Sequence, residues 1–360
     1  MVDIEQLAND VLEFSKTRAK DNYTINIIIV GPPGSGKSTI AEKLSANLNK
    51  KFKEFIQNKV IASIGLDTNV DINRSNELIE GYYTSGIPDI SDELRKTLNN
   101  KGFDEKLVEN VNFKPVKECI IANNKQQGYK IIGRGGMDNS IEIQPHKIQD
   151  IELNDINISQ IIPMDGFHLS RKCLDEFKDP NNAHQRRGAP STFDSNNFLQ
   201  LCKLLCKTSK IKPIITESST QESTNLDNPF SAFLNSFNQN IPNILVPGFN
   251  HAEKDPKTNV YDISCFTRIM IVEGLYLLYN QENWLHIYKS LLETNSVLFF
   301  NIDLDDEILE DRVAKRHLNS GIVDNLEDGI KRFRSNDVIN AGLLRKYNVH
   351  DDNIIQLNND

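Results

Sequence analysis

The residues best suited to chemistry form one short segment near the start of the chain. It matches the pattern G-x-x-x-x-G-K-[ST] over Gly31, Pro32, Pro33, Gly34, Ser35, Gly36, Lys37, Ser38 and Thr39. In such a segment the glycines let consecutive backbone N–H groups converge on phosphate oxygens. The lysine reaches the β- and γ-phosphates of a nucleotide, and the Ser38 hydroxyl can bind Mg²⁺. A loop that needed glycine only for its turn would not require Lys37 or Ser38, so we interpret 31–39 as a nucleotide-phosphate site.

A metal ion at such a site also needs a carboxylate, and two acidic residues follow apolar runs in a suitable way. Glu273 directly follows the run IMIV, and Asp165 directly follows the run IIPM. Open α/β sheets bind their ligands at the carboxyl ends of parallel strands, so we expect both acids near 31–39. The alternative is that each carboxylate only caps a strand-to-loop junction. A third such acid, Asp303, is better explained as the start of the next helix.

The segments around these residues indicate strands that alternate with helices. Apolar, β-branched runs without polar alternation are typical of strands buried on both faces, and they predict strands within 25–30, 158–164, 268–279, 296–304 and 352–357, with a further extended run at 243–249. Helical spacing of apolar residues predicts helices at 3–20, 40–50, 196–207, 283–293, 305–318 and 326–344. Asp194 is predicted to cap the helix at 196–207. This alternation predicts an α/β fold with three α/β/α layers and a mainly parallel central sheet of about five strands.

Two stretches interrupt this pattern. Residues 51–155 are rich in Asn, Lys, Asp and Glu, and their weak strand candidates, 129–136 and 141–144, predict a hairpin with a tight turn at the sequence GRGG. Residues 208–240 are rich in Ser, Thr and Asn, which predicts a flexible polar loop. The rest of the chain has the size of one α/β domain. We therefore expect residues 1–360 to form a single domain, in which 51–155 is an α+β insertion or small subdomain.

The composition narrows the class of protein. The 360 residues include 50 acidic and 41 basic side chains, which gives a formal net charge of −9. This balance argues against nucleic-acid binding as the main function, because affinity for the phosphate backbone needs concentrated Lys and Arg. No apolar run approaches the roughly 18 residues of a membrane span. The start does not resemble a secretory or transit peptide, and five scattered cysteines suit a reducing compartment, so we expect a cytoplasmic protein.

Several motifs together resemble the P-loop kinase superfamily that contains phosphoribulokinase, uridine kinase, bacterial-type pantothenate kinase and glycerate kinase. They are, in order, the segment 31–39, MDGFH at 164–168, RRGAPSTFD at 186–194, PGFNH at 247–251, VEGL at 272–275 and the helix with Arg312 and Arg316. The combination is most similar to a fungal group of ATP-dependent kinases whose substrate is unassigned. The resemblance covers about 22–50, 156–206 and 241–358, and it includes neither insertion.

The resemblance implies a role for each matching residue. Asp165 corresponds to the acid that accepts the proton of the substrate hydroxyl, and Glu273 to the strand-end carboxylate near Mg²⁺. Arg312 and Arg316 correspond to a basic lid helix that closes on the phosphates. Their spacing of four lets both face one side of a helix, although a solvated helix face is the alternative. The positions that correspond to the acceptor site are His168, Arg187, Asn250, His251 and Asn336. The alternatives are a structural hydrogen bond for His168, pairing with surface acids for one of Arg186 and Arg187, and a polar helix face for Asn336.

The chemistry of these residues agrees with the resemblance. Phosphoryl transfer mainly requires in-line positioning and neutralisation of charge, while one carboxylate orients or deprotonates the incoming hydroxyl. We therefore expect an enzyme, an ATP- and Mg²⁺-dependent kinase that transfers the γ-phosphoryl group to a hydroxyl of a small metabolite, such as a sugar, a nucleoside, or a glycerate- or pantothenate-like acceptor. The preference for ATP over GTP is implied by the resemblance alone. The alternatives are a regulatory nucleotide-binding protein or slow ATPase whose insertions dock a partner, and a nucleoside monophosphate kinase.

Overall fold

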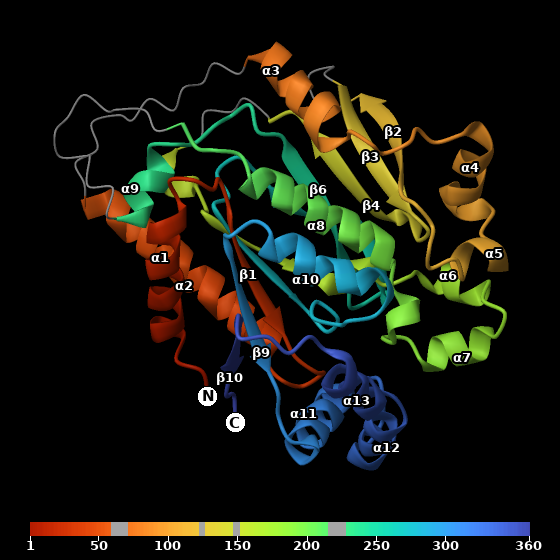
Figure 1. Ribbon diagram of the computed structural model, residues 1–360. Coiled ribbons are helices and arrows are strands. Elements are labelled where there is room, and N and C mark those ends of the chain that lie inside the picture. The colour runs from red at the N-terminus through yellow and green to blue at the C-terminus, as the bar shows by residue number, and fades with distance from the viewer. Residues whose placement is uncertain (59–70, 122–126, 147–151, 215–227) are drawn as a thin grey trace.

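A parallel sheet of five strands forms the centre of the computed structural model, which describes residues 1–58, 71–121, 127–146, 152–214 and 228–360. The strand order is β10-β9-β1-β8-β5, and every pairing within this sheet is parallel. Figure 1 labels β10, β9 and β1 of this sheet. The strands are β1 (Ile25–Val30), β5 (Ser159–Pro163), β8 (Ile269–Gly274), β9 (Val297–Ile302) and β10 (Ile354–Leu357). The five-stranded parallel sheet expected from the apolar runs is therefore confirmed.

Helices cover both faces of this sheet, as the strand β1 illustrates. All six of its residues are buried, and their side chains alternate between two cores because successive Cβ atoms point to opposite faces. Ile28 and Val30 pack in one core with α8 (Ser195–Ser209) and α10 (Leu285–Leu292). Ile25, Ile27 and Ile29 pack in the other core with α1 (Ile4–Arg18) and α2 (Lys37–Asn58). The predicted three-layer α/β/α arrangement is thus confirmed (Figure 1).

A second sheet of five strands lies beside the first, and all its pairings are antiparallel. Its order is β2-β3-β4-β6-β7, with β2 (Val116–Ile121), β3 (Gln127–Gly133), β4 (Gly136–Gln144), β6 (Asn243–Asn250) and β7 (Asp255–Ile263). The pairing of β3 with β4 confirms the predicted hairpin. The extended run at 243–249 forms β6 and joins this sheet, so the polar segment and the later part of the chain share one sheet.

The boundaries of the two interruptions differ from the expected ones. The helix predicted at 40–50 extends as α2 to Asn58, so the first interruption begins later than residue 51. The prediction of a polar loop over 208–240 does not hold at α9 (Pro229–Leu234), which begins at the N-cap Asn228. Phe230 and Phe233 of α9 are buried against the core of α1 and α2. The composition of 208–240 as a whole is polar, so it did not indicate these buried side chains. The remainder of that prediction, 215–227, lies outside the described residues.

Three helices follow β9 and lie together beside the end of the sheet (Figure 1). They are α11 (Asp306–Asn319), α12 (Leu326–Arg332) and α13 (Val338–Tyr347), and a π-helical segment, Phe333–Asp337, joins the last two. The other short helices are α3 (Ile72–Asn76), Glu77–Tyr83, α4 (Asp92–Lys96), Thr97–Lys101, α5 (Glu105–Val108), α6 (Arg171–Asp175) and α7 (Pro180–Gln185), with single 3₁₀ turns at Leu153–Asp155, Met164–Phe167, Pro190–Thr192 and Glu282–Trp284.

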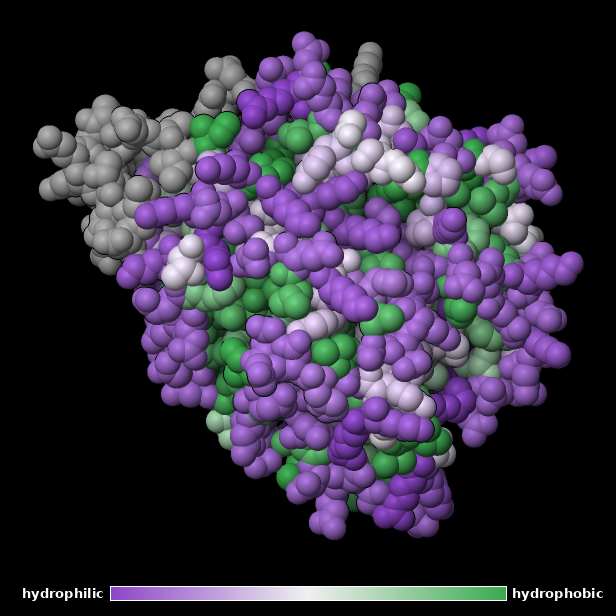
Figure 2. Space-filling model, viewed as in Figure 1, coloured by the Kyte–Doolittle hydropathy of each residue, from purple (hydrophilic) through white to green (hydrophobic). Residues whose placement is uncertain are grey.

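The surface agrees with the acidic, polar composition. The face in Figure 2 is mainly hydrophilic, and hydrophobic side chains appear on it only as small separate patches. Within the residues that the structure describes, no helix combines the length and the apolar character needed to cross a membrane.

Candidate active site

The predicted phosphate loop connects β1 to α2 at the carboxyl edge of the parallel sheet. Gly34 and Gly36 have φ angles of +84° and +87°, which L-residues with side chains rarely adopt. Lys37, the first residue of α2, is 9% exposed, so its ammonium group lies at a protected edge of the loop. The amino end of α2 adds positive potential beside it. The segment therefore has the geometry of an anion site for phosphate.

Glu273 lies directly beside this loop. It is opposite Ile29 in the pairing of β8 with β1, and the Ser38 hydroxyl donates to its Oε1 at 3.1 Å. Burial raises the pKa of the Glu273 carboxyl to about 7, although Lys37 acts in the opposite direction. The negative charge of Glu273 is only partly compensated, and the Ser38 hydroxyl lies beside it. Together they offer the hard oxygen ligands that Mg²⁺ prefers. These two side chains therefore fit a magnesium ion.

Asp165 follows the next strand of the same sheet. Pro163 of β5 is opposite Glu273 of β8, and Asp165 lies in the 3₁₀ turn Met164–Phe167 immediately after β5. Its side chain is 42% exposed, so a ligand can reach the carboxylate from solvent. The charge of Asp165 adds to the rise in the pKa of Glu273, which indicates that the two carboxyl groups share one region.

An aromatic cluster surrounds His168, three residues after Asp165. The His168 ring lies 4.0 Å from that of Phe193 and 5.0 Å from that of Phe249, measured between centroids, and Phe249 contacts His251 at 5.3 Å. Burial lowers the pKa of His168, which leaves the ring neutral at pH 7. Its Nδ1 lies 2.9 Å from the Asp165 carbonyl oxygen. Because a carbonyl can only accept, Nδ1 carries the proton and Nε2 is an acceptor.

Arg187 belongs to this cluster, but its charge already has a partner. Its Nη2 donates to Asp255 Oδ1 at 2.8 Å and to the Leu169 carbonyl at 2.9 Å. The guanidinium also lies over the Phe249 ring, 5.5 Å from its centroid. These contacts hold β7 against the loop that contains Arg187 and reduce the charge available to a ligand.

Two other predicted acceptor residues also make bonds within the protein. The Asn250 side chain accepts from the backbone N–H of Ala252 at 3.0 Å, so it caps its own turn. Asn336 accepts from the Arg186 guanidinium and donates to the Arg187 carbonyl at 3.1 Å. Both residues lie near the His168 cluster or the loop that frames it, and their contact with an acceptor stays a prediction.

The helix α11 packs directly on the phosphate loop. A Cβ at Gly34 would lie 2.7 Å from Val313 Cγ2, so a larger residue would not fit there. Arg312, one residue earlier, donates from Nη2 to the Asn359 carbonyl at 2.9 Å, and Asn359 Nδ2 donates to the Ser35 carbonyl at 2.8 Å. Arg316 lies one turn further along α11. Burial raises the pKa of the Asp337 carboxyl, and the positive charge of Arg316 acts against this rise.

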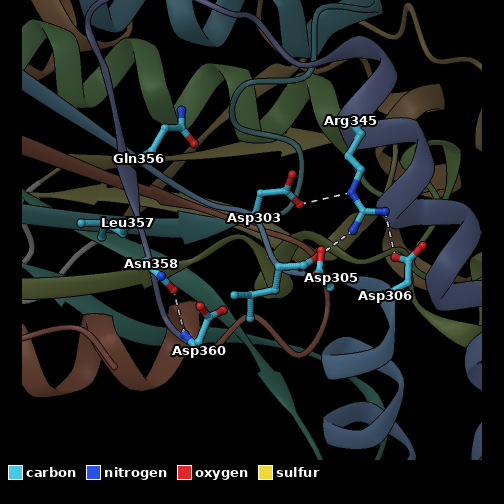
Figure 3. A pocket seen from close by; sticks show the side chains of 9 residues that line it. Asp303, Asp305, Asp306, Arg345, Gln356, Leu357, Asn358 and Asp360 are labelled. Atoms are coloured by element: carbon cyan, nitrogen blue, oxygen red, sulfur yellow. Dashed lines mark hydrogen bonds and ion pairs between the residues drawn. The ribbon is translucent and has the colours of Figure 1, made fainter.

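A cavity of about 530 Å³ opens at the ends of β9 and β10 (Figure 3). Arg345 lies in its wall and pairs with Asp303 at 3.2 Å and with Asp306 at 2.8 Å. Asp303 is therefore an ion-pair partner, while α11 begins at Asp306 after the N-cap Asp305. We assign no ligand to this cavity, because its arginine is already paired with the acids beside it.

Comparison with known proteins places the chain in a family. No protein-family model matches it. The ATP-dependent kinase YFH7 of Saccharomyces cerevisiae is 45% identical over 364 residues, which cover 100% of both chains. The YFH7 protein of Kluyveromyces lactis is 42% identical over 363 residues, with 98% of this chain and 97% of the relative covered. The chain belongs to the YFH7 family of ATP-dependent kinases.

Solved structures agree with this assignment. The crystal structure of YFH7 from Saccharomyces cerevisiae, described as a candidate P-loop kinase with a circular permutation, has a TM-score of 0.82 at 45% identity and covers 100% of both chains. A candidate fructose transport system kinase from Silicibacter sp. TM1040 has a TM-score of 0.51 at 17% identity, with 99% of this chain and 100% of the other covered, and this likeness shows the fold alone. The predicted resemblance to a fungal group of ATP-dependent kinases is therefore confirmed.

The structure of this YFH7-family chain also brings residues to the site that sequence reasoning missed. Asn359 reaches the phosphate loop, and only the predicted strand at 352–357 hinted at its position. The strand β7, which contains Tyr261, contacts the turn Met164–Phe167. Burial raises the pKa of the Tyr261 hydroxyl, and the charges of Glu273 and Asp165 add to this rise. Tyr261 lies between Val260 and Asp262 in β7, where no sequence motif distinguished it.

Proposed function

We propose that this chain is a Mg²⁺-dependent kinase that transfers the γ-phosphoryl group of ATP to a hydroxyl of a small metabolite. The observation that supports this most is the order of groups along three adjacent strand ends. The phosphate loop follows β1, Glu273 ends its neighbour β8, and Asp165 follows the next strand, β5. A nucleotide on the loop would therefore direct its terminal phosphate toward the acid and the cluster around His168.

Each group has one part in the proposed reaction. Asp165 accepts the proton of the acceptor hydroxyl, whose oxygen then bonds to the γ-phosphorus. The bond from that phosphorus to the bridging oxygen breaks, and ADP keeps the electron pair. Lys37 and the two arginines of α11, Arg312 and Arg316, neutralise the charge of the transferring group. Ser38 and Glu273 would hold Mg²⁺, which would further neutralise the phosphate oxygens when bound.

The chemistry around His168 favours an acceptor rich in hydroxyl groups. The neutral ring offers the Nε2 lone pair, which accepts from a hydroxyl and repels a carboxylate or phosphate oxygen. Arg187 is already paired with Asp255, so it gives less attraction to an anion than a free guanidinium would. Among the expected acceptors we therefore place a sugar or nucleoside ahead of glycerate- or pantothenate-like acids.

The proposed setting is the cytoplasm. The five cysteines, Cys119, Cys173, Cys202, Cys206 and Cys265, are free thiols, and only Cys119 is exposed. Burial raises the pKa of Cys173 and of Cys206 to about 12, so these thiols stay protonated and unreactive. Such cysteines suit a reducing compartment.

Transfer from labelled ATP to a panel of sugars, nucleosides and hydroxy acids tests the proposal. We expect consumption of ATP only with the right acceptor. Asp165→Asn should abolish transfer but retain ATP binding, and Lys37→Met should weaken both. Asp303→Asn is the matched control, because it changes a strand-end acid that pairs with Arg345 outside the proposed site. Acceptor-independent hydrolysis that Asp165→Asn leaves intact would favour a slow ATPase or regulatory protein.

A further inference from the structure

The turn between β3 and β4, residues 133–136, reaches the part of the site that holds Asp165. Arg134 is 1% exposed and donates from Nη2 to the backbone carbonyl of Phe193 at 2.7 Å. The ring of Phe193 packs in turn on that of His168, with centroids 4.0 Å apart. The tight turn predicted from the sequence GRGG therefore supports the wall of the candidate site.

Asn139 of β4 makes a more direct connection to the turn with Asp165. Its Nδ2 donates to the carbonyl oxygens of Gly166 at 2.9 Å and of His168 at 2.8 Å, so both hydrogens of one amide nitrogen are used. The Asn139 side chain is fully buried, and water cannot replace either bond. Residues 164–167 form only a single 3₁₀ turn, which has little hydrogen bonding of its own.

The turn is held from two sides by the antiparallel sheet. Each of the four carbonyl groups of residues 165–168 has a donor, and Asn139 supplies two of them. The other two accept from the backbone N–H groups of His168 and Asp194. On its other side the turn lies against β6, because a Cβ on Gly166 would overlap a backbone carbonyl of that strand. The turn therefore has little freedom while Asn139 stays in place.

We propose that Asn139 is a positioning residue for phosphoryl transfer, which fixes the turn so that the Asp165 carboxylate stays directed at the incoming hydroxyl. The inference rests on the kinase function proposed above. It makes β3 and β4 a built part of the site, although the sequence motifs typical of P-loop kinases lie outside these two strands. Asn139 is itself held in place, since Asn197 Nδ2 donates to its backbone carbonyl at 2.7 Å.

NMR titration of the His168 ring in the full chain, with isotope-labelled histidine, tests the inference. Burial is the main cause that lowers the pKa of His168, Arg187 and His251 act in the same direction, and Asp165 opposes them. In Asn139→Ala the turn loses two bonds and admits water, so we expect this pKa to rise toward its ordinary value.

The uncharged variant Asn139→Leu, close to asparagine in size, separates hydrogen bonding from space filling. It removes both N–H donors and adds no charge near the His168 ring. We expect the His168 pKa to rise, as in Asn139→Ala. If Asn139 only filled space, the leucine variant would titrate like the wild type.

Asn22→Ala provides the matched control. Asn22 is also buried, and its Nδ2 also donates to two carbonyls, those of Ser209 at 3.3 Å and Thr294 at 3.1 Å, but it lies before the amino end of β1. We expect a similar loss of melting temperature in the two alanine variants and a changed His168 titration only at Asn139. An unchanged His168 titration in both Asn139 variants, or an equal change in Asn22→Ala, would overturn the inference.

The melting temperature with Mg·ATP distinguishes this inference from the kinase proposal. Mg·ATP should stabilise the wild-type chain, because a ligand that binds only the folded state raises its stability. If Mg·ATP gives no stabilisation, the kinase proposal fails. The His168 result then still decides whether Asn139 holds the turn.

Discussion

Replacement of Glu273 by glutamine should stabilise the protein, and only at neutral to alkaline pH. Burial raises the pKa of Glu273 from 4.5 to about 7, which corresponds to about 3 kcal/mol at about 1.4 kcal/mol per tenfold change. Lys37 and the Ser38 hydroxyl compensate the charge only in part. Glutamine has nearly the same shape and can still accept from Ser38, but it cannot ionise. Glu273→Gln thus removes the cost of a buried charge and keeps the packing.

The direction of the pH dependence follows from which state holds the proton more tightly. The folded chain keeps the Glu273 proton up to about pH 7, whereas the unfolded chain releases it near pH 4.5. Between these values the unfolded state binds fewer protons, so the free energy of unfolding of the wild type falls as pH rises. Urea denaturation should show similar stability for both proteins at about pH 5, and a Glu273→Gln variant more stable by up to about 3 kcal/mol at about pH 8.

A control at another buried glutamate isolates the cause. Glu142 is 6% exposed, close to the 5% of Glu273, but it pairs with Lys130 Nζ at 3.0 Å. Glu142→Gln therefore breaks an ion pair and should not stabilise the chain at pH 8. If Glu273→Gln gained the same stability at both pH values, or lost stability at pH 8, the account of an incompletely compensated buried carboxylate would be wrong.

Three further substitutions test other contacts. Gly34→Ala should destabilise the protein by about 1–3 kcal/mol in urea denaturation and weaken Mg·ATP binding, because a methyl group at positive φ would meet Val313. A variant with wild-type ATP affinity would contradict the packing of α11 on the loop. Arg187→Lys should lower the free energy of unfolding by about 1–3 kcal/mol, because an ammonium cannot reproduce the planar guanidinium that bridges Asp255 and a backbone carbonyl. An unchanged melting curve would refute this. Arg268→Met should lower the free energy of unfolding by about 2–4 kcal/mol, because the buried guanidinium donates to two backbone carbonyls and a hydroxyl, which would lose their donor. Calorimetry that shows no loss of stability would contradict this prediction.

The phosphate side of the site could be predicted from the sequence because its information is local. The apolar run at 25–30, the glycine-rich turn and the start of α2 are consecutive, so one pattern specifies strand, loop and helix together. The position of Glu273 also followed, since an acid at the end of a buried strand lies at the ligand edge of a parallel sheet. The capping role of Asp194 is confirmed, because its side chain accepts from the Asn197 N–H at 3.3 Å.

The acceptor side could not be predicted in the same way, because it depends on pairings between distant segments. The strand β4 pairs with β6 across a long stretch of chain, and no local pattern in either strand specifies that register. The contact of Asn139 with the Asp165 turn is a consequence of this pairing. The composition of 51–155 as a whole is polar, so it did not indicate that β3 and β4 contain buried residues such as Ile131 and Ile141.

The different origin of the two sides has a consequence for the evolution of specificity. The proposed phosphate loop is one continuous segment, so most changes within it should damage phosphate binding directly. The proposed acceptor side depends on side-chain bonds between separate elements, such as those of Asn139 with the Asp165 turn and of Arg187 with Asp255. A substitution in β4, β6 or β7 can therefore reshape the space around His168 while the phosphate loop, which packs against α11, keeps its geometry. The antiparallel sheet is accordingly the part of the fold in which we expect acceptor specificity to be determined.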